Sequence, residues 1–430
     1  MGSAPHVGQA FFPLDRELAL PPGKLTPHAY ESMVGLATWM PFDRARTELE
    51  RLLRVVVSEP TVRRYAEAAG KNQVAVQMRE VERIERTLPE APAGPARQLL
   101  SVDGAMAPLV GGEWAEVKTL VIGEIQPAVQ EGGEAVVHTE KLSYFSRLAE
   151  ATQFGRQALV ETHHRGVEKA EVVAAVTDGA EWEQGFIDYH RPDAIRILDF
   201  AHASEHLSQI GQAVWRAETP QTKQWLSDQL HTLHQAGPEQ VLVELRRLRD
   251  QHPTQPEIVT HLAYLEKRAA HMRYPEYIAQ GLPIGSGAVE SANKLVVEAR
   301  LKGSGMHWAR HHVNPMLALR NVACNDRWQE AWPQIIDHHR QQALLRQRQR
   351  RDQRLASLAT PPPLPPIPTP VPPPAQLLTP EPPALQPSPL PPAAPTTPQS
   401  HHRPAPNHPW RRMPVGKARY PPSTPSVRKN

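Results

Sequence analysis

The order of hydrophobic and polar positions divides the chain into regions with different predicted structures. In residues 27–88 the apolar side chains recur at helical spacing. Residues 96–206 carry short, β-rich apolar runs that later alternate with helical stretches. Residues 207–281 are polar and helical again, with leucines as core positions. We therefore predict an α/β fold that follows a helical region and is interrupted by an all-helical insertion.

The last helix predicted in the first region is a candidate for contact with DNA. Ser58 is a suitable N-cap, and Gly70 is a residue type that commonly ends a helix. Between them, Arg63 and Arg64 face outward while the apolar residues face inward. A short helix that presents two arginines after another helix is typical of a helix-turn-helix recognition element. An ordinary solvated helix in a small bundle is the alternative.

The β-rich region has an informative order of elements. Three strands come first, and two further strands then alternate with helices. We expect the strands at Leu99–Asp103, Trp114–Ile125, Glu134–His138, Glu171–Asp178 and Ala194–Asp199, and the first helix at Leu142–Arg165. This order predicts a mixed sheet with helices on its faces. In such a sheet the first and fourth strands lie side by side and run parallel.

An aspartate followed by a glycine ends each of these two neighbouring strands. Asp103 ends the first strand and Asp178 ends the fourth. A single Asp-Gly pair at a strand end is usually a turn, but the predicted topology would bring these two carboxylates together. Asp199 also ends a strand and is therefore an alternative partner for Asp103. The topology favours Asp178, because its strand lies directly beside the first.

A glycine-rich entry leads into a helix that carries a third carboxylate. Gly285 and Gly287 precede this helix, and Glu290 lies in its first turn on the same face as Lys294. A surface pair between Glu290 and Lys294 is the simpler interpretation. Three carboxylates without cysteine partners, however, suit a hard divalent cation such as Mg²⁺ or Mn²⁺. Two such ions can activate a water or a 3′-hydroxyl and stabilise the leaving oxygen of a phosphodiester.

Basic and aromatic residues near the third carboxylate suit contact with nucleic acid. Lys294, Arg300 and Lys302 would neutralise phosphates close to the carboxylates. Trp308 would stack on an unpaired base, and a tryptophan in the core is the alternative. Further along, the arginines of residues 346–354 form a basic stretch that suits a nonspecific DNA-binding arm.

Four motifs resemble those of bacterial insertion-sequence DDE transposases of the ISKra type, in the Mutator-like group with an RNase H-like core. Within residues 30–335 they are Ser-Val-Asp103-Gly, Val-Thr-Asp178-Gly-Ala-Glu-Trp, Asp199-Phe-Ala-His202, and the run from Ile-Gly-Ser-Gly through Glu290 to Trp308. The resemblance implies a catalytic site of Asp103, Asp178 and Glu290 that binds two Mg²⁺ or Mn²⁺ ions. It implies that Asp199 and His202 position the site or the DNA, and a helix N-cap with a capping histidine is the alternative.

The composition of the chain excludes several kinds of site and segment and predicts the character of its C-terminal part. The single cysteine, Cys324, excludes an intramolecular disulfide and a cysteine-based zinc site. No apolar run approaches the ~18 residues of a transmembrane helix, and the first residues do not resemble a signal peptide. Of the 47 prolines, 26 follow residue 360, and the chain from Arg340 onward holds 13 basic and 2 acidic residues. This composition predicts a disordered basic tail. We expect the protein to be cytoplasmic and nucleoid-associated.

The expected organisation combines these regions. We expect a flexible N-terminus (1–26), a helix-turn-helix-like DNA-binding region (27–88), the first part of an RNase H-like core (96–206), a helical insertion (207–281), the completion of the core (282–335), a basic helical stretch (336–358) and a Pro-rich disordered tail (359–430). The expected function is a transposase that cleaves the ends of its element and joins them to target DNA. Its partners would be double-stranded DNA and at least one further copy of the chain. A metal-dependent nuclease of the same fold, or an inactive or domesticated DNA-binding protein, is the alternative.

Overall fold

A five-stranded mixed sheet forms the centre of the computed structural model, which describes residues 25–131 and 134–359. The strand order is β5-β2-β1-β6-β7. The strands are β1 (Arg97–Pro108), β2 (Trp114–Ile125), β5 (Thr139–Arg147), β6 (Val172–Thr177) and β7 (Ile195–Leu198). β5, β2 and β1 are antiparallel neighbours, whereas β6 and β7 run parallel to β1. The predicted α/β class and the parallel pairing of the first strand with the Asp178 strand are confirmed.

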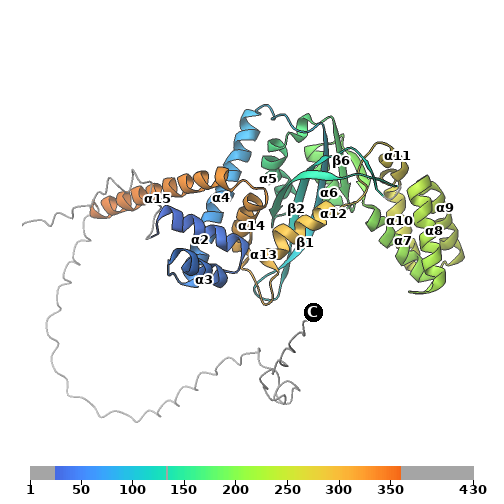
Figure 1. The fold of residues 1–430 in the computed structure, drawn as a ribbon, viewed down its shortest axis with the longest axis horizontal. Coiled ribbons are helices and arrows are strands. Elements are labelled where there is room, and N and C mark those ends of the chain that lie inside the picture. Colours follow the sequence, from blue (N-terminus) through green and yellow to red (C-terminus); the bar gives the residue numbers. More distant parts are fainter. Residues whose placement is uncertain (1–24, 132–133, 360–430) are drawn as a thin grey trace, which may run out of the picture. The chain divides into compact units, whose positions relative to one another are not determined.

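Helices cover both faces of this sheet (Figure 1). Because side chains alternate between the faces of a strand, Leu100 and Val102 pack on one side against α5 (Ala151–His164) and α6 (Glu181–His190). Leu99, one residue earlier, contributes to the core on the other side, where α7 (Phe200–Trp215) and the helical insertion pack. Asp103 shares the face of Leu99. It lies inside β1 and not at its end, because β1 continues to pair with β2 as far as Pro108.

The third strand of the sheet differs from the prediction. The segment from Leu142 onward, expected to begin a helix, belongs to β5, and the helix begins only at Ala151. Two asparagines of α14 (Arg310–Cys324) and a third directly after it complete the outer edge at β5, since each accepts from a backbone N–H and donates to the C=O of the same residue. The pairs are Asn314 with Leu148, Asn321 with Ser146 and Asn325 with Tyr144.

The segment that had been expected as the third strand forms a hairpin outside the main sheet. β4 (Glu134–Val136) pairs antiparallel with β3 (Val129–Glu131) in a separate two-stranded sheet. The prediction of a main-sheet strand over Glu134–His138 is therefore wrong. β5, which holds Thr139, Tyr144 and Phe145, pairs with β2 on one edge and contacts the asparagines on the other, whereas β4 is the short segment Glu-Ala-Val and pairs with β3.

The N-terminal helical region is built around one long helix. Its helices are α2 (Pro27–Trp39), α3 (Phe42–Leu53) and α4 (Glu59–Thr87). Ser58 is the N-cap residue of α4, as predicted, but the helix does not end at Gly70. A Cβ at Gly70 would lie 2.2 Å from the carbonyl oxygen of Pro315 in α14, so this glycine permits close packing and does not terminate the helix. The prediction of a short recognition helix over residues 58–70 is therefore wrong.

The predicted all-helical insertion is present between β7 and the helix that carries Glu290. After α7 its helices are α8 (Pro220–Ala236), α9 (Pro238–Gln251), α10 (Pro256–Lys267), the 3₁₀ turn Ala269–His271 and α11 (Tyr274–Ala279). The Glu290 helix is continuous, with α12 (Gly287–Ala292), a π-helical turn (Asn293–Glu298) and α13 (Ala299–Leu301) in succession. It packs on β1 and β2 beside the sheet (Figure 1).

The C-terminal part of the described chain is a single helix, α15 (Trp328–Ala359). It joins the end of the predicted core and the predicted basic stretch, and residues 25–359 fall within one packed unit. The side chains of residues 346–354 are exposed. The predicted tail beyond residue 359, and residues 1–24 of the predicted flexible N-terminus, lie outside the described residues, but Thr26 caps α2. Among the described residues, no helix is long and apolar enough to cross a membrane.

Candidate metal centre

Two predicted carboxylates meet where β1 and β6 lie side by side. Oxygens of Asp103 in β1 and of Asp178, which directly follows β6, lie within 4.8 Å of each other and of an oxygen of Glu183. Asp103, Asp178 and the predicted third carboxylate, Glu290, also line one cavity of about 130 Å³. The sheet topology therefore brings together side chains that are 75 residues or more apart in the sequence.

Hydrogen bonds hold the Asp103 carboxylate in place. Oδ1 accepts from the Gly104 N–H at 2.6 Å, and Oδ2 accepts from Nδ2 of Asn293 at 2.8 Å. Despite these donors the pKa of Asp103 is raised, first by burial and then by the charges of Asp178 and Glu290. A carboxylate whose neighbours have the same charge is stabilised by a cation that all of them can share.

The Asp178 carboxylate is held very differently. Its Oδ1 is buried and has no hydrogen-bond partner among the described residues. The backbone, in contrast, is fixed by the next residue, Gly179, which has φ +80° in the left-handed region where glycine is favoured. A buried oxygen without a donor is costly, and a metal ion would compensate for that cost. Asp178 therefore has the free ligand atom that such a site requires.

Glu183 is the residue that sequence reasoning missed. It lies in the first turn of α6, is 1% exposed, and accepts from the Ala180 N–H at 3.0 Å. Burial, and then a hydrogen bond and charge from Asp178, raise the pKa of Glu183 to about 10. At neutral pH it is therefore a neutral acid that donates to Asp178. The only sequence signal is its place three residues after the N-cap, which ordinarily indicates helix capping.

Glu290 approaches the cavity from the opposite wall. It lies in the first turn of α12 and its side chain is exposed. Its charge contributes to the raised pKa of Asp103. Asn293, one turn later on the same helix, makes the hydrogen bond to Asp103 described above. The Glu290 helix is thus tied to β1 through Asn293, while the glutamate itself is free to turn toward a ligand.

Asp199, the alternative second carboxylate, already has its donors. It is the N-cap of α7 and accepts from the Ala201 N–H at 3.3 Å. It also accepts from the Ser286 N–H at 3.1 Å and from the Ser286 hydroxyl at 3.0 Å. Asp199 thereby ties the start of α7 to the loop before the Glu290 helix. This geometry favours Asp178 as the ligand and a structural role for Asp199.

His202 lines the same cavity and begins a chain of three histidines. Its Nε2 lies 3.3 Å from Nε2 of His206, whose Nδ1 lies 2.8 Å from Nδ1 of His261 in α10. Because His206 uses one ring nitrogen for each neighbour, the three rings form a line and not a cage around a common point. This arrangement is a hydrogen-bonded link between α7 and the insertion, and it does not suit a metal site.

The residues predicted to contact DNA fall into two groups. Arg63, Arg64 and Lys294 are exposed, and Lys302 is half-buried in an ion pair with Glu298 at 2.6 Å. Arg300 and Trp308 are 1% and 7% exposed. Nε of Arg300 donates to the Ala37 carbonyl, its guanidinium lies over the Phe42 and Trp308 rings, and the indole of Trp308 donates to the Leu301 carbonyl. These two are core residues, which contradicts the prediction that they contact DNA.

The donor set fits a hard divalent cation. Asp103, Asp178 and Glu290 offer carboxylate oxygens, the ligands that Mg²⁺ and Mn²⁺ prefer. The raised pKa of Asp103 and the unpartnered Oδ1 of Asp178 are both features that a cation would relieve. Glu183 could join only after losing its proton, because it is neutral in the metal-free arrangement.

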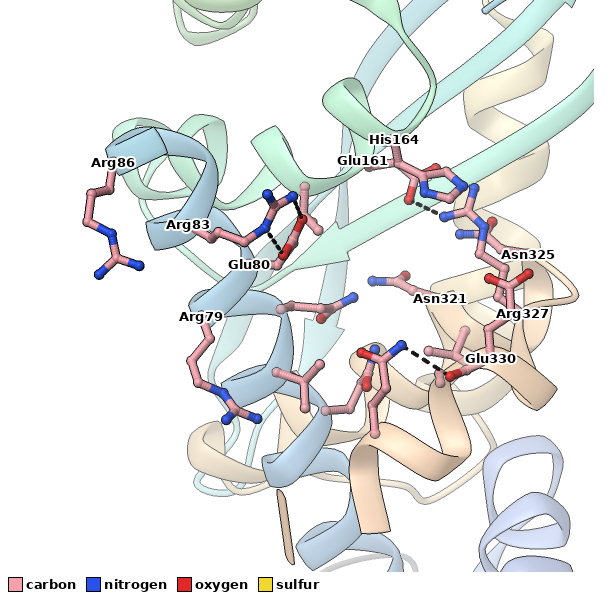
Figure 2. A pocket seen from close by; sticks show the side chains of 17 residues that line it. Arg79, Glu80, Arg83, Arg86, Glu161, His164, Asn321, Asn325, Arg327 and Glu330 are labelled. Carbon is pink, nitrogen blue, oxygen red and sulfur yellow. Dashed lines mark hydrogen bonds and ion pairs between the residues drawn. The ribbon is translucent and has the colours of Figure 1, made fainter. Parts of the chain in front are cut away.

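A larger hollow elsewhere on the molecule has a different character. A groove of about 660 Å³ runs between α4, α5, α14 and α15, and Figure 2 shows the charged side chains on its walls. Nε and Nη2 of Arg83 donate to Glu80 at 2.8 and 2.6 Å, and Arg327 makes two hydrogen bonds with Glu161 at 2.7 and 2.9 Å. Arg83 and Arg327 are thus already neutralised, whereas Arg79 and Arg86, which also line the groove, are exposed to solvent.

Comparison with known proteins does not assign a function to this site, so the assignment rests on its residues. No family model matches this chain, and no curated protein matches it.

Proposed function

We propose that this protein is a DNA transposase whose RNase H-like domain cleaves and joins strands with Asp103, Asp178 and Glu290. The observation that carries the proposal is that these three side chains line one cavity. Three further features support it: the strand order β5-β2-β1-β6-β7, the parallel pair β1–β6 beneath the two aspartates, and the all-helical insertion before the Glu290 helix.

The roles of the chain's own residues follow from their surroundings. Asp103, fixed by Gly104 and Asn293, and Asp178, with its free oxygen, would hold two divalent cations together with Glu290. Mg²⁺ or Mn²⁺ in this place supplies an activated water or 3′-hydroxyl and offsets charge on the leaving oxygen. The neutral Glu183 would orient Asp178 by its hydrogen bond.

DNA would approach over the exposed side of the Glu290 helix. Lys294 is exposed one turn beyond Glu290, and Arg63 and Arg64 are exposed on α4. Contacts of this kind neutralise phosphates and make affinity depend on salt. Joining two element ends to one target requires two active sites, so we expect a dimer or larger assembly on DNA. We expect the protein to act in the cytoplasm, at the nucleoid.

Cleavage and joining of a labelled element end test this proposal. The wild type is compared with Asp178→Ala, Asp199→Ala and Glu183→Gln in Mg²⁺ or Mn²⁺, and DNA binding is measured in parallel. We expect Asp178→Ala to lose both steps while it retains DNA binding. Asp199→Ala should lose stability as well as activity, because it loses a helix cap and the contact with Ser286. Glu183→Gln should retain measurable cleavage.

The other outcomes separate the alternatives. Cleavage that is never followed by joining would indicate a nuclease of the same fold. DNA binding without cleavage in any metal would indicate an inactive or domesticated DNA-binding protein. If Asp199→Ala remains fully folded but is inactive, and Asp178→Ala is active, then Asp199 is the second ligand and our assignment is wrong.

A further inference from the structure

The carboxylates of the metal centre differ in what holds them. Asp103 receives two hydrogen bonds on its side chain, and Asp199 receives three. Oδ1 of Asp178 receives none among the described residues, and the charge of Asp103 lies close by. Apart from the hydrogen bond from Glu183, the position of the Asp178 carboxylate therefore depends on the backbone turn that carries it.

Two side chains of the helical insertion bind the turn that carries Asp178. The hydroxyl of Tyr264 in α10 donates to the Asp178 carbonyl. Arg268, at the end of α10, donates to the Gly179 carbonyl from Nε at 3.0 Å and from Nη2 at 2.6 Å. Both carbonyls of the Asp178–Gly179 turn are thus held by residues about 90 positions away in the chain.

The two clamping side chains are themselves held rigidly. Arg268 is 9% exposed, and its guanidinium lies over the Tyr264 ring, 3.6 Å from the centroid. The same ring stacks on His206 of α7, with centroids 3.9 Å apart and planes 8° from parallel. A side chain at Gly179 would collide with this assembly, since its Cβ would lie 2.5 Å from Nε of Arg268. The turn and the clamp are therefore fitted closely to each other.

We propose that Tyr264 and Arg268 are positioning residues that set the metal affinity of the site by fixing Asp178. This inference rests on the function proposed above, in which Asp178 is a metal ligand. Without the clamp, repulsion from Asp103 favours conformations of the turn in which the Asp178 carboxylate moves away. The insertion would then act on the metal centre from a distance, although none of its side chains binds the metal.

Metal binding gives the most direct test. Mn²⁺ alone is titrated into the full-length protein, and free Mn²⁺ is followed by electron paramagnetic resonance. Loss of a residue that orients a ligand typically weakens metal binding by ~10–100-fold, so we expect Arg268→Ala to raise the Mn²⁺ concentration at half-saturation by about 10-fold or more. Arg268→Lys keeps one donor, so its Mn²⁺ concentration at half-saturation should lie between those of Arg268→Ala and the wild type. Tyr264→Phe, which keeps the ring stack, should show a smaller shift in the same direction.

A matched control distinguishes positioning from general damage to the insertion. Arg246 on α9 is exposed and pairs with Glu266 of α10, between Tyr264 and Arg268 in the sequence, at 2.7 Å, so Arg246→Ala removes an arginine contact of the same helix but neither clamping side chain and should bind Mn²⁺ like the wild type. In DNA cleavage, Arg268→Ala should require more Mg²⁺ but regain most of its kcat at saturating Mg²⁺, with DNA affinity unchanged. Circular dichroism verifies that each variant is folded, and Tyr264→Phe carries the test if Arg268→Ala is not.

The outcomes separate this inference from the proposed function. If both Arg268→Ala and Tyr264→Phe reach half-saturation at the same Mn²⁺ concentration as the wild type, the inference is wrong, whatever their cleavage activity. A wild type that binds Mn²⁺ but never cleaves DNA would overturn the proposed function, and the Mn²⁺ shift would still decide the inference. A kcat that stays low at saturating Mg²⁺ would also count against positioning, because added metal cannot then restore the site.

Discussion

The cavity at the end of β6 and the groove of Figure 2 are both polar, but their charges are arranged in opposite ways. In the groove, carboxylates meet arginines in bidentate pairs, as in Arg327 with Glu161. In the cavity, carboxylates lie beside each other, and burial together with the charges of Asp178 and Glu290 raises the pKa of Asp103. Proteins tolerate like charges at close range only where something else compensates for them.

This comparison distinguishes a structural charge cluster from a functional one. The groove is five times larger than the cavity, about 660 against 130 Å³, but its carboxylates Glu80 and Glu161 are both paired with arginines. The cavity leaves a buried oxygen of Asp178 without a donor. Crowded carboxylates without a paired arginine, and not volume, therefore identify the candidate site.

The largest expected effect is that of Asp178→Asn in the cavity. The change keeps the shape of the side chain but removes one of the crowded charges. A bound metal contributes several kcal/mol to transition-state stabilisation, so strand cleavage should fall on the order of 10³-fold or more. The melting temperature in EDTA should not fall, because repulsion with Asp103 is relieved. A variant that melts well below the wild type in EDTA would show that the carboxylate has a structural role.

Glu161→Gln makes the corresponding change in the groove and should have the reverse result. Glu161 is 5% exposed, and its loss leaves Arg327 without its carboxylate. Breaking a largely buried pair in this way should cost about 2–3 kcal/mol of the free energy of unfolding, measured by urea denaturation. Cleavage by the folded protein should not change. Glu80→Gln, which breaks the exposed pair with Arg83, is the control and should cost less than ~0.5 kcal/mol.

The smallest effects are opposite shifts in pKa between the two regions. Burial raises the pKa of Asp103, whereas the hydrogen bond from Arg83 lowers the pKa of Glu80. Acidification in EDTA therefore adds to stability through Asp103, which binds its proton more tightly when folded. It removes stability through Glu80, as the pH falls through the folded pKa of that group. Carboxyl ¹³C shifts would measure both, and an Asp103 that titrates below its ordinary pKa would contradict the description of the cavity.

The parallel pairing of β1 with β6 and the positions of the two aspartates near it were predictable because they depend on local signals. Short apolar runs followed by Asp-Gly indicated where β1 and β6 come together, and the spacing of elements indicated that these strands are parallel. The insertion was predictable in the same way from its polar helical pattern. Local signals were misleading at Leu142 and Gly70, where β5 and the middle of α4 are fixed by α14, about 175 and 245 residues away.

The site itself was predictable only in part. Asp103, Asp178 and Glu290 stood out because each follows or precedes glycines in a recognisable motif. Glu183 resembled a capping residue, and Arg300 and Trp308 resembled DNA contacts, because sequence alone does not indicate burial.

Contiguous patterns of residues were enough to predict the class of fold, the carboxylates Asp103, Asp178 and Glu290, and the existence of the insertion. Only the folded structure shows which side chains are uncharged, which lack a hydrogen-bond partner and which are fixed by contacts. Tyr264 and Arg268 donate hydrogen bonds to the backbone of the Asp178–Gly179 turn, and no local sequence pattern predicts these contacts. Charge, burial and hydrogen bonding are properties of surroundings, and those surroundings form only when distant segments pack together.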